Sequence, residues 1–516
     1  MARKLKNRIQ IIDLFAGPGG LGEGFASYSD GVSNPFQIAI SIEKEASAHS
    51  TLELRALFRR LRKNDKLAPY YAFLRGELGR QPKDGLYLLP ELEEYLNETR
   101  QETLKLELGQ DRRETFKHVR KNLKKDVPTV LIGGPPCQAY SLVGRSRNYG
   151  DKTRDYRPED DHRNFLYKEY LAILAKFQPE VFVMENVKGI LSAKVGEGGI
   201  FTQILEDLAE PHKAVSGTKK CRYKIIPLVS NLGNDLFDSN HSPRDYIIQA
   251  ERFGVPQARH RVILLGIRED ILGNEVASLR PSPTTDTKST ISDLPRIRSK
   301  LSKEPDSLGN WRNAIGKIDL RDVKSYSGSE ISDSLRDTLA EINLTELDVF
   351  GKVSGSNSHD IPKNLSDWLI DPEMGSLVVN HESRGHIVGD LHRYLFAAVY
   401  AQHKKRSAKA ADFPPSLIPH HKNFNSGKFV DRFKVQREEV PASTITSHIS
   451  KDGHYYIHYD PRQCRSLTVR EAARIQTFPD NYFFVGNRTQ QYVQVGNAVP
   501  PYLARQIADI VAGILE

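Results

Sequence analysis

Short apolar runs separated by polar, helix-like stretches dominate the first half of the chain. The runs are IQIIDLFAG (9–17), QIAISIE (37–43), TVLIGG (129–134), EVFVMEN (180–186), YKIIPLVS (223–230), DYIIQAERFG (245–254) and RVILLGI (261–267). They are rich in Ile and Val and end near Gly, Glu or Pro, which is typical of buried strands. The alternation with helical patterns predicts an α/β fold built on a buried sheet.

The hydrophobic pattern changes twice along the chain and predicts three regions. An α/β body covers 1–295 and contains a charged helical insertion at about 52–125, which we expect to be a solvated excursion rather than a DNA-contacting face. Residues 296–436 are irregular and rich in Ser, Asp and Asn. Residues 437–516 return to the body, with a capping box at Thr468 and Glu471 and a closing amphipathic helix.

Charge and cysteine content narrow the possible partners and compartments. Lys and Arg number 74 against 65 Asp and Glu, a net charge of +9, which is compatible with a polyanion such as nucleic acid. The 3 cysteines have no C-x-x-C spacing and indicate a reducing compartment. The basic N-terminus lacks the apolar run of a signal peptide, and no stretch approaches about 20 apolar residues. We therefore expect a cytoplasmic protein without a membrane segment.

A glycine turn follows the first predicted strand and predicts a cofactor site. Gly17, Gly19 and Gly22 satisfy G-x-G-x-x-G, and Glu43 ends the next strand, where an acidic residue can bind ribose hydroxyls. The pattern does not distinguish NAD from S-adenosylmethionine (SAM), and a glycine turn without a ligand remains an alternative.

Three further strand ends carry reactive side chains. Cys137 follows the rigid turn GGPP; a lone cysteine is usually buried and inert, but the loop around this one is polar and contains arginines that can lower a thiol pKa. Glu185 and Asn186 end another strand, and Arg259 and Arg261 flank His260 at the start of a third, with a spacing that predicts one shared face. Ligands of α/β proteins bind at such a sheet edge, so these groups predict an active site.

A thiol, a carboxyl group, two arginines and a nucleotide-type cofactor site together favour methyl transfer to cytosine. A thiolate that adds to C6 of cytosine makes C5 able to attack a methyl sulfonium, while a carboxylic acid at N3 and arginines at the carbonyl oxygen relieve the developing charge. Hydride transfer by a nicotinamide dehydrogenase would need neither the thiolate nor the Glu-Asn turn, although that enzyme class remains an alternative.

Six motifs in order resemble those of the cytosine-C5 DNA methyltransferase family over nearly the whole chain. They are DLFAGPGGLGEGF, GGPPCQAYS, MENV, QARHR, RSLTVREAARIQTFPD and QVGNAVPP. The resemblance implies a class I SAM-dependent methyltransferase fold, a Rossmann-like and mostly parallel sheet flanked by helices, with a smaller irregular target-recognition domain at 296–436. It implies methylation of cytosine C5 in a specific double-stranded DNA sequence, through base flipping and a covalent bond between the cysteine and C6.

The same resemblance assigns roles to residues. Cys137 would be the nucleophile, Glu185 would contact N3 and the exocyclic amine, and Arg259 and Arg261 would stabilise base and thiolate. The residues implied to bind SAM are Phe15, Gly17, Gly19, Gly20, Glu43, Glu77, Pro135, Leu166 and Asn497. Those implied to contact DNA, on or after the loop that follows Cys137, are Ser141, Arg145, Arg147 and Arg163. That loop carries an apparent insertion, NYGDKTRDYRPED (148–160), and Val143 stands where some relatives place a small polar residue.

The partners follow from the same assignment. In 296–436, the stretches NHESRGHIVGDLHRYLF (380–396) and PHHKNFNSGKF (419–429) are the predicted groove-facing elements. No Cys-Phe-Thr occurs, which favours DNA over transfer RNA, and the histidine spacing predicts no metal site. We expect a monomer that acts beside a restriction endonuclease or other defence proteins. A catalytically silent DNA-binding regulator is disfavoured because Cys137 and Glu185 are present; the target sequence cannot be derived from the sequence.

Overall fold

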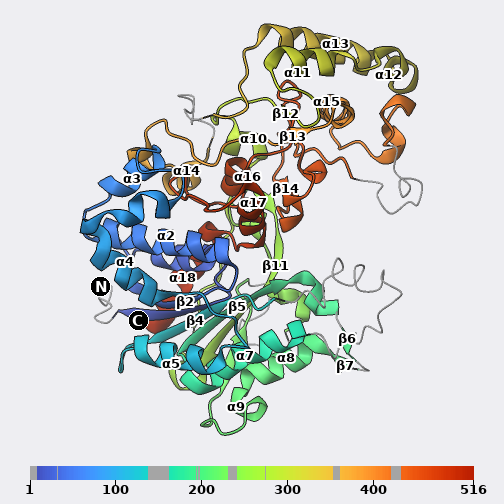
Figure 1. Cartoon of the computed structure of the whole chain (residues 1–516). Coiled ribbons are helices and arrows are strands. Elements are labelled where there is room, and N and C mark those ends of the chain that lie inside the picture. Colours follow the sequence, from blue (N-terminus) through green and yellow to red (C-terminus); the bar gives the residue numbers. More distant parts are fainter. Residues whose placement is uncertain are drawn as a thin grey trace. The chain divides into compact units, whose positions relative to one another are not determined.

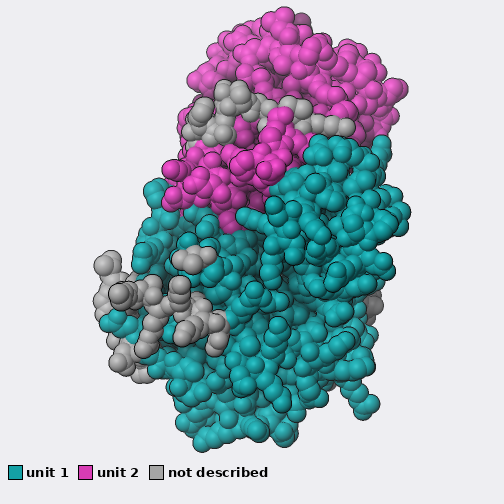
Figure 2. Space-filling view, turned by 90° about the vertical axis from the view of Figure 1, so that its left-hand side faces the viewer, with its two compact units in different colours: residues 1–253, 259–283, 498–516 teal, residues 254–258, 284–497 magenta. Residues whose placement is uncertain are grey.

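The computed structural model describes residues 8–31, 33–136, 162–192, 194–195, 198–229, 241–273, 275–351, 361–419 and 432–516. The chain forms two compact units (Figure 2). Unit 1 comprises 1–253, 259–283 and 498–516, and unit 2 comprises 254–258 and 284–497. No helix within the described ranges is both long and apolar enough to cross a membrane.

Unit 1 is built on a mixed sheet whose eight strands include every strand predicted from the sequence. Its order is β3-β2-β1-β4-β5-β11-β8, with β9 also paired to β11. The bounds are β1 (Ile9–Leu14), β2 (Phe36–Ile42), β3 (Thr103–Leu104), β4 (Thr129–Gly133), β5 (Val181–Val187), β8 (Tyr223–Ile226), β9 (Ile247–Gln249) and β11 (His260–Arg268). Strands β1 to β5 pair in parallel, whereas β11 runs antiparallel to β5, β8 and β9. The carboxyl ends of β1, β2, β4 and β5 therefore meet at one edge of the sheet.

Helices cover both faces of this sheet (Figure 1). On one face lie α1 (Gly20–Ala26), α2 (Ala46–Lys63), α4 (Glu93–Glu102) and α18 (Pro501–Leu515); on the other lie α5 (Arg112–Asn122), α7 (His162–Phe177) and α8 (Ile200–Ala209). The second group packs on a core cluster that includes Leu131, Phe182 and Leu264, all fully buried. A Cβ added to Gly24 would stand 2.4 Å from the Ala504 Cβ, so a glycine is required where α1 and α18 cross.

The charged segment 52–125 is part of this architecture, and the prediction of a solvated excursion was wrong for α2. Its charged positions alternate with apolar ones, and the helix buries Leu54, Leu57 and Leu61. Arg55 is itself 3% exposed and donates to both carboxylate oxygens of Glu23 in α1, at 2.9 and 2.6 Å. Burial alone would raise the pKa of Glu23, but the Arg55 guanidinium lowers it below its usual value. One residue of this charged segment, Arg55, therefore forms a buried ion pair with Glu23.

Replacing Arg55 by Met should lower the free energy of unfolding by about 3 kcal/mol, because Glu23 would remain buried with only the more distant Arg59, at 3.8 Å, as a charged partner. The expected measurement is urea unfolding of the full chain followed by circular dichroism. The double variant Arg55→Met/Glu23→Gln is the control and should recover most of the loss, since it removes both charges. An unchanged unfolding midpoint in Arg55→Met would contradict the importance of the pair.

Unit 2 is mostly helical, with two-stranded pieces β10 (Gln257–Ala258) with β14 (Ala442–Ser443) and β12 (Lys300–Leu301) with β13 (Gly385–His386). Its helices of eight or more residues are α11 (Leu308–Gly316), α12 (Leu320–Ser327), α13 (Ser329–Leu344), α15 (Val388–Lys404) and α17 (Arg488–Asn497). Shorter helices are α10 (Thr287–Ile291), α14 (Lys363–Leu369) and α16 (Val469–Ile475). The capping box predicted for α16 is confirmed: Thr468 Oγ1 accepts from Glu471 N–H, and Glu471 accepts from Thr468 N–H.

The units divide the chain at 283/284 and 497/498, not at the predicted boundaries 295/296 and 436/437. Helices α16 and α17 belong to unit 2 because they pack on α10, on each other and on the turn Ser447–Ser450. Gly496 shows how close this packing is, since a Cβ there would stand 2.3 Å from Ser447 N. Only 498–516, which contains α18, returns to unit 1.

The first stretch predicted to face a DNA groove, 380–396, is largely buried within unit 2, which corrects that prediction. Arg384 donates to the carbonyls of Ile449 and Lys451, and His381 bonds to Thr468 and to the Pro295 carbonyl. These polar side chains form hydrogen bonds inside unit 2. The composition of the stretch could not predict their burial. In the described part of the chain, no group of His, Cys, Asp and Glu has a metal-binding arrangement. The second stretch, 419–429, lies almost wholly outside the described residues.

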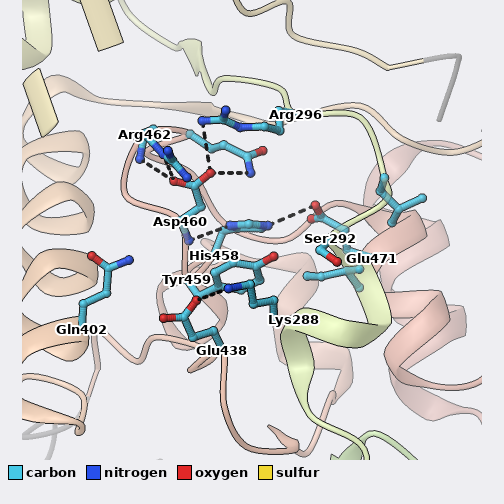
Figure 3. A pocket seen from close by; sticks show the side chains of 13 residues that line it. Lys288, Ser292, Arg296, Gln402, Glu438, His458, Tyr459, Asp460, Arg462 and Glu471 are labelled. Atoms are coloured by element: carbon cyan, nitrogen blue, oxygen red, sulfur yellow. Dashed lines mark hydrogen bonds and ion pairs between the residues drawn. The ribbon is translucent and has the colours of Figure 1, made fainter. Parts of the chain in front are cut away.

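A polar cavity of about 190 Å³ lies in unit 2, and charged side chains of both signs line it (Figure 3). Asp460 pairs with Arg462 at 2.8 Å and with Arg296 at 3.3 Å, and Lys288 pairs with Glu438 at 3.4 Å. His458 Nδ1 accepts from the Asp460 N–H, so this ring is neutral with its proton on Nε2. The charges around the cavity thus neutralise one another.

Buried neutral histidines make the stability of unit 2 dependent on pH. Burial lowers the pKa of His381 and of His458 to about 4. The unfolded chain takes up these protons near pH 6.5 while the folded chain does not, so the full stability is present above pH 6.5 and falls as the pH drops towards 4. At pH 5 we expect a loss of about 2 kcal/mol per histidine. Urea unfolding at pH 7 and pH 5 measures the loss, and His458→Gln should reduce it; an equal loss in the variant would contradict this origin.

Candidate active site

The glycine loop lies at the carboxyl end of β1 and has a backbone that most residues cannot adopt. Gly17 and Gly19 have φ of 58° and 101°, in the left-handed region that favours glycine. Phe15 shares that region at 55°, a conformation that is rare for an aromatic residue and concentrates at functional sites. A Cβ on Gly17 would meet no atom within 4 Å, so open space lies beside the loop.

Glu43, just after β2, joins this loop to the neighbouring strand. Its Oε2 accepts from Gly17 N–H at 2.9 Å and its Oε1 accepts from Glu45 N–H at 2.7 Å. Each carboxylate oxygen keeps a further lone pair, which can accept from a hydroxyl. The structure therefore brings together Gly17, Gly19 and Glu43, as the sequence predicts.

A buried carboxyl that the sequence analysis overlooked lies at the end of β1. Asp13 is 1% exposed, and neither of its oxygens has a hydrogen-bond partner among the described residues. Burial raises the pKa of Asp13 to about 8; Arg59 opposes this rise, and Glu43 adds to it. A Cβ on Gly22 would stand 2.8 Å from Oδ2, so helix α1 lies directly against this group. The raised pKa favours the protonated form of Asp13, and helix α1 packs on this buried acid.

Glu185 lies near the end of β5, beside the turn that leads to Cys137. Its Oε1 pairs with Arg261 Nε at 2.9 Å, from the start of the antiparallel strand β11. Asn186 donates from Nδ2 to the Pro135 carbonyl at 3.3 Å, which fixes the first proline of the GGPP turn. The Glu-Asn pair thus has two distinct tasks. Glu185 is 14% exposed and available to a ligand, whereas Asn186 is buried and structural.

Arg259 and Arg261 do not share the environment that their spacing predicts. Arg259 precedes β11, which begins at His260, so regular strand alternation does not extend to it. It is 2% exposed and donates from Nη2 to the Ala498 carbonyl at 2.9 Å. Arg261 faces Glu185. Arg261 thus contacts the Glu185 carboxylate, whereas Arg259 binds the backbone carbonyl of Ala498.

The other residues implied to bind the cofactor lie in different parts of the structure. Leu166 on α7 and Phe15 are partly buried and pack against the same core cluster of unit 1. Gly20 begins α1, where a Cβ would stand 2.4 Å from the Val499 carbonyl oxygen, so this glycine serves packing. Asn497 is the last residue of α17, in unit 2.

Glu77 has no visible connection to the glycine loop. It is 55% exposed and its Oε1 pairs with Arg75 Nε at 2.5 Å. A better-placed acidic residue is Glu107. It follows β3, which pairs in parallel with the end of β2, and its Oε1 accepts from Lys44 Nζ at 3.1 Å, next to Glu43. Because β3 has only two residues, no sequence pattern could locate the strand end that Glu107 follows.

Several predicted residues cannot be placed. Cys137, Ser141, Arg145 and Arg147 lie outside the described residues, as does the insertion 148–160, and the side chain of Arg163 on α7 is not described. The assembled site therefore consists of the glycine loop, Glu43, the Pro135–Pro136 turn, Glu185 and Arg261, all from unit 1.

A family model described as C-5 cytosine-specific DNA methylase matches residues 92–212 and 228–512, which is most of the chain. The chain belongs to the C-5 cytosine-specific DNA methylase family. This membership makes it a DNA (cytosine-5-)-methyltransferase and confirms the resemblance found in the six motifs.

Named relatives of this methylase support the same assignment. Type II methyltransferase M.Bpa9945I of Bacillus paralicheniformis is 33% identical over 530 aligned residues, 98% of this chain and 99% of the relative. DNA (cytosine-5-)-methyltransferase M.ApeKI of Aeropyrum pernix is 28% identical over 421 aligned residues, which cover 75% of this chain and 81% of the relative. A crystal structure of a "putative DNA modification methyltransferase" encoded within a prophage (E. coli) aligns with a TM-score of 0.50 at 17% identity, over 98% and 99% of the chains. The predicted class I α/β fold is confirmed.

Proposed function

We propose that this methylase uses SAM as methyl donor and modifies cytosine C5 in one double-stranded DNA sequence, as the modifying enzyme of a type II restriction-modification system. The observation that carries the proposal is the Glu185–Arg261 pair beside the Pro135 turn, on the same sheet edge as the glycine loop. The names of the type II relatives support the restriction-modification role. A cognate endonuclease is then the expected partner.

The residues at the sheet edge fit SAM. Glu43 keeps lone pairs for two ribose hydroxyls, Phe15 offers an aromatic face for the adenine, and open space beside Gly17 admits a ligand to the backbone. Leu166 and Pro135 would line the pocket. SAM, when bound, supplies the methyl group that C5 accepts.

The protein's own groups account for activation of the base. The target cytosine leaves the duplex, because the reacting atoms are inaccessible within the base stack. The Cys137 thiolate forms a bond to C6, Glu185 as a carboxylic acid holds a proton at N3, and Arg261 holds Glu185 in place. C5 then accepts the methyl group. Loss of the C5 proton to solvent and departure of the Cys137 thiolate from C6 follow, which breaks the S–C6 bond and restores the C5–C6 double bond. Ser141, Arg145, Arg147 and Arg163 would contact the DNA around the flipped base.

Two acidic residues, Glu107 and Glu77, are candidates for binding the adenine of SAM, and substitution of each tests which one does. We expect Glu107→Gln to weaken SAM binding about 10-fold, the scale of one hydrogen bond to a charged group, and Glu77→Gln to leave it unchanged. Isothermal titration with SAM measures both affinities. A weaker affinity in Glu77→Gln alone would restore the residue chosen from the sequence.

Purified protein tests the proposed function directly. It should transfer labelled methyl groups from SAM to duplex DNA and not to a transfer RNA, and a titration should show binding of SAM but not of NAD. Binding of NAD in place of SAM, or transfer to the transfer RNA instead of DNA, would contradict the proposal.

A further inference from the structure

A groove of about 560 Å³ lies on unit 1 at the amino ends of β1 and β2, the sheet edge opposite the glycine loop. Its walls come from the start of these strands, from α2, α4 and α5, and from the segment that leads into β4. Strand β1 has 6 residues, so the groove and the glycine loop are separated by about 20 Å at roughly 3.3 Å per residue. The groove is therefore a site distinct from the candidate active site.

Basic side chains without carboxylate partners mark this groove. The side chains of Lys121 and Lys124 are exposed, and neither ammonium group makes an ion pair or hydrogen bond with another described residue. Among the described residues, Arg8 makes one side-chain hydrogen bond, to Gln37, and this bond is long at 3.5 Å. The acidic residues of the groove, Glu98 and Glu102, are already bound by Arg60 at 3.2 and 2.6 Å. The positive charge of Arg8, Lys121 and Lys124 is thus uncompensated.

A buried glutamine and a partly buried asparagine fix the backbone around the two lysines. Gln10 is 6% exposed, and its side chain accepts from the Lys124 N–H and donates to the Lys124 carbonyl, both at 2.9 Å. Asn122, next to Lys121, donates to the carbonyls of Ala39 and Gln101. The backbone that carries both lysines is therefore tied to β1, β2 and α4.

We propose that this groove is a second DNA-binding site that holds the phosphate backbone of duplex DNA without reading its sequence. The inference rests on the proposed function only in taking DNA as the polyanion that the enzyme meets. DNA presents a regular line of negative charge, and each neutralised phosphate releases counterions. The groove is open and its amide groups, from Gln37 and Gln101, can donate to phosphate oxygens. A duplex engaged at the active site cannot reach the opposite edge without strong bending, so the groove binds a separate stretch of a long DNA or a second DNA molecule.

A second contact of this kind raises the affinity for long DNA without changing the chemistry. When one stretch of a long molecule is held in the groove, the effective concentration of neighbouring stretches at the active site increases. Short duplexes occupy one site at a time and gain nothing. The length dependence of binding is therefore the signature of the groove.

Charge reversal tests the proposal. The variant Lys121→Glu/Lys124→Glu should bind a long DNA roughly 10-fold more weakly, and the slope of log affinity against log salt should decrease by about 2, at 0.9 per lost phosphate contact. Binding and methylation of a duplex of about 15 base pairs, roughly 50 Å at 3.4 Å per pair, should be unchanged. The matched control is Lys219→Glu/Lys220→Glu, which reverses two exposed charges near the start of β8.

The outcomes separate the possible explanations. Equal affinity of the variant and the control for long DNA would overturn the proposal, even if the enzyme methylates normally. Saturable binding of ATP that the variant loses, with unchanged binding of long DNA, would assign the groove to a small phosphate ligand instead. Lys121 also lies in the last turn of α5, where a cation offsets the helix dipole. A lower melting temperature with an unchanged salt slope would therefore show a purely structural role. Binding is measured without methylation, so a failure of the proposed methyl transfer would not affect this test.

Discussion

Cys137→Ala is expected to reduce methyl transfer to the background of the assay, because this thiol forms the proposed bond to C6. The measurement is the transfer of labelled methyl groups from SAM to duplex DNA. Binding of SAM should be unchanged, since the glycine loop and Glu43 remain intact. A DNA that contains 5-fluorocytosine at its target, which blocks release of the enzyme, should trap the native protein and not the variant.

Cys221→Ala is the matched control for this experiment. Cys221 is 7% exposed, and burial raises its thiol pKa, so it is an unreactive cysteine of the same chain. The control should retain full transfer. Activity of Cys137→Ala within about 10-fold of the native enzyme would contradict the role of this thiol.

Glu185→Gln is expected to lower kcat by about 10²–10⁴-fold, the usual contribution of a positioned acid or base. The amide cannot deliver a proton to N3, and Arg261 loses its charged partner at 2.9 Å. Single-turnover rates with saturating SAM and DNA separate this loss from any loss of binding.

Glu180→Gln gives a comparison at the other end of β5. Glu180 precedes β5 at the opposite sheet edge and pairs with Arg268 at 3.0 Å, so its substitution should affect stability but not the chemical step. Equal rate losses in the two variants would indicate a general disturbance of β5 rather than proton transfer by Glu185.

The sequence was sufficient for seven of the eight strands of the sheet and for the strand ends at which the glycine loop, Glu43 and Glu185 lie. Buried strands carry a continuous apolar signal, and the glycine loop, Glu43 and Glu185 each follow directly from a strand end. The two-residue strand β3 carries no such signal, so the strand end that Glu107 follows could not be predicted, and Glu77 was the acidic candidate in its place.

Burial of charge was harder to predict, because it depends on partners that are distant in the sequence. In the sequence, Arg55 resembles the other residues of a solvated charge run. Its partner Glu23 is 32 residues away, so no local pattern predicts the buried pair. Asp13 looks like an ordinary residue of a strand, yet its carboxyl is buried without a hydrogen-bond partner in the described structure. Arg384 resembles a base-reading side chain but binds carbonyls inside unit 2. Local patterns predict where a chain turns, whereas tertiary contacts decide which charges are enclosed.

The most direct measurement of the central claim is the modification of DNA in cells that lack cytosine C5 methylation and express this chain. Mass spectrometry of the nucleosides should detect 5-methylcytosine, and bisulfite sequencing should place it in one sequence context. DNA from cells that express Cys137→Ala should contain none. Unmodified DNA from cells with folded native protein, or a methyl group on the exocyclic amine of cytosine instead of C5, would contradict the account.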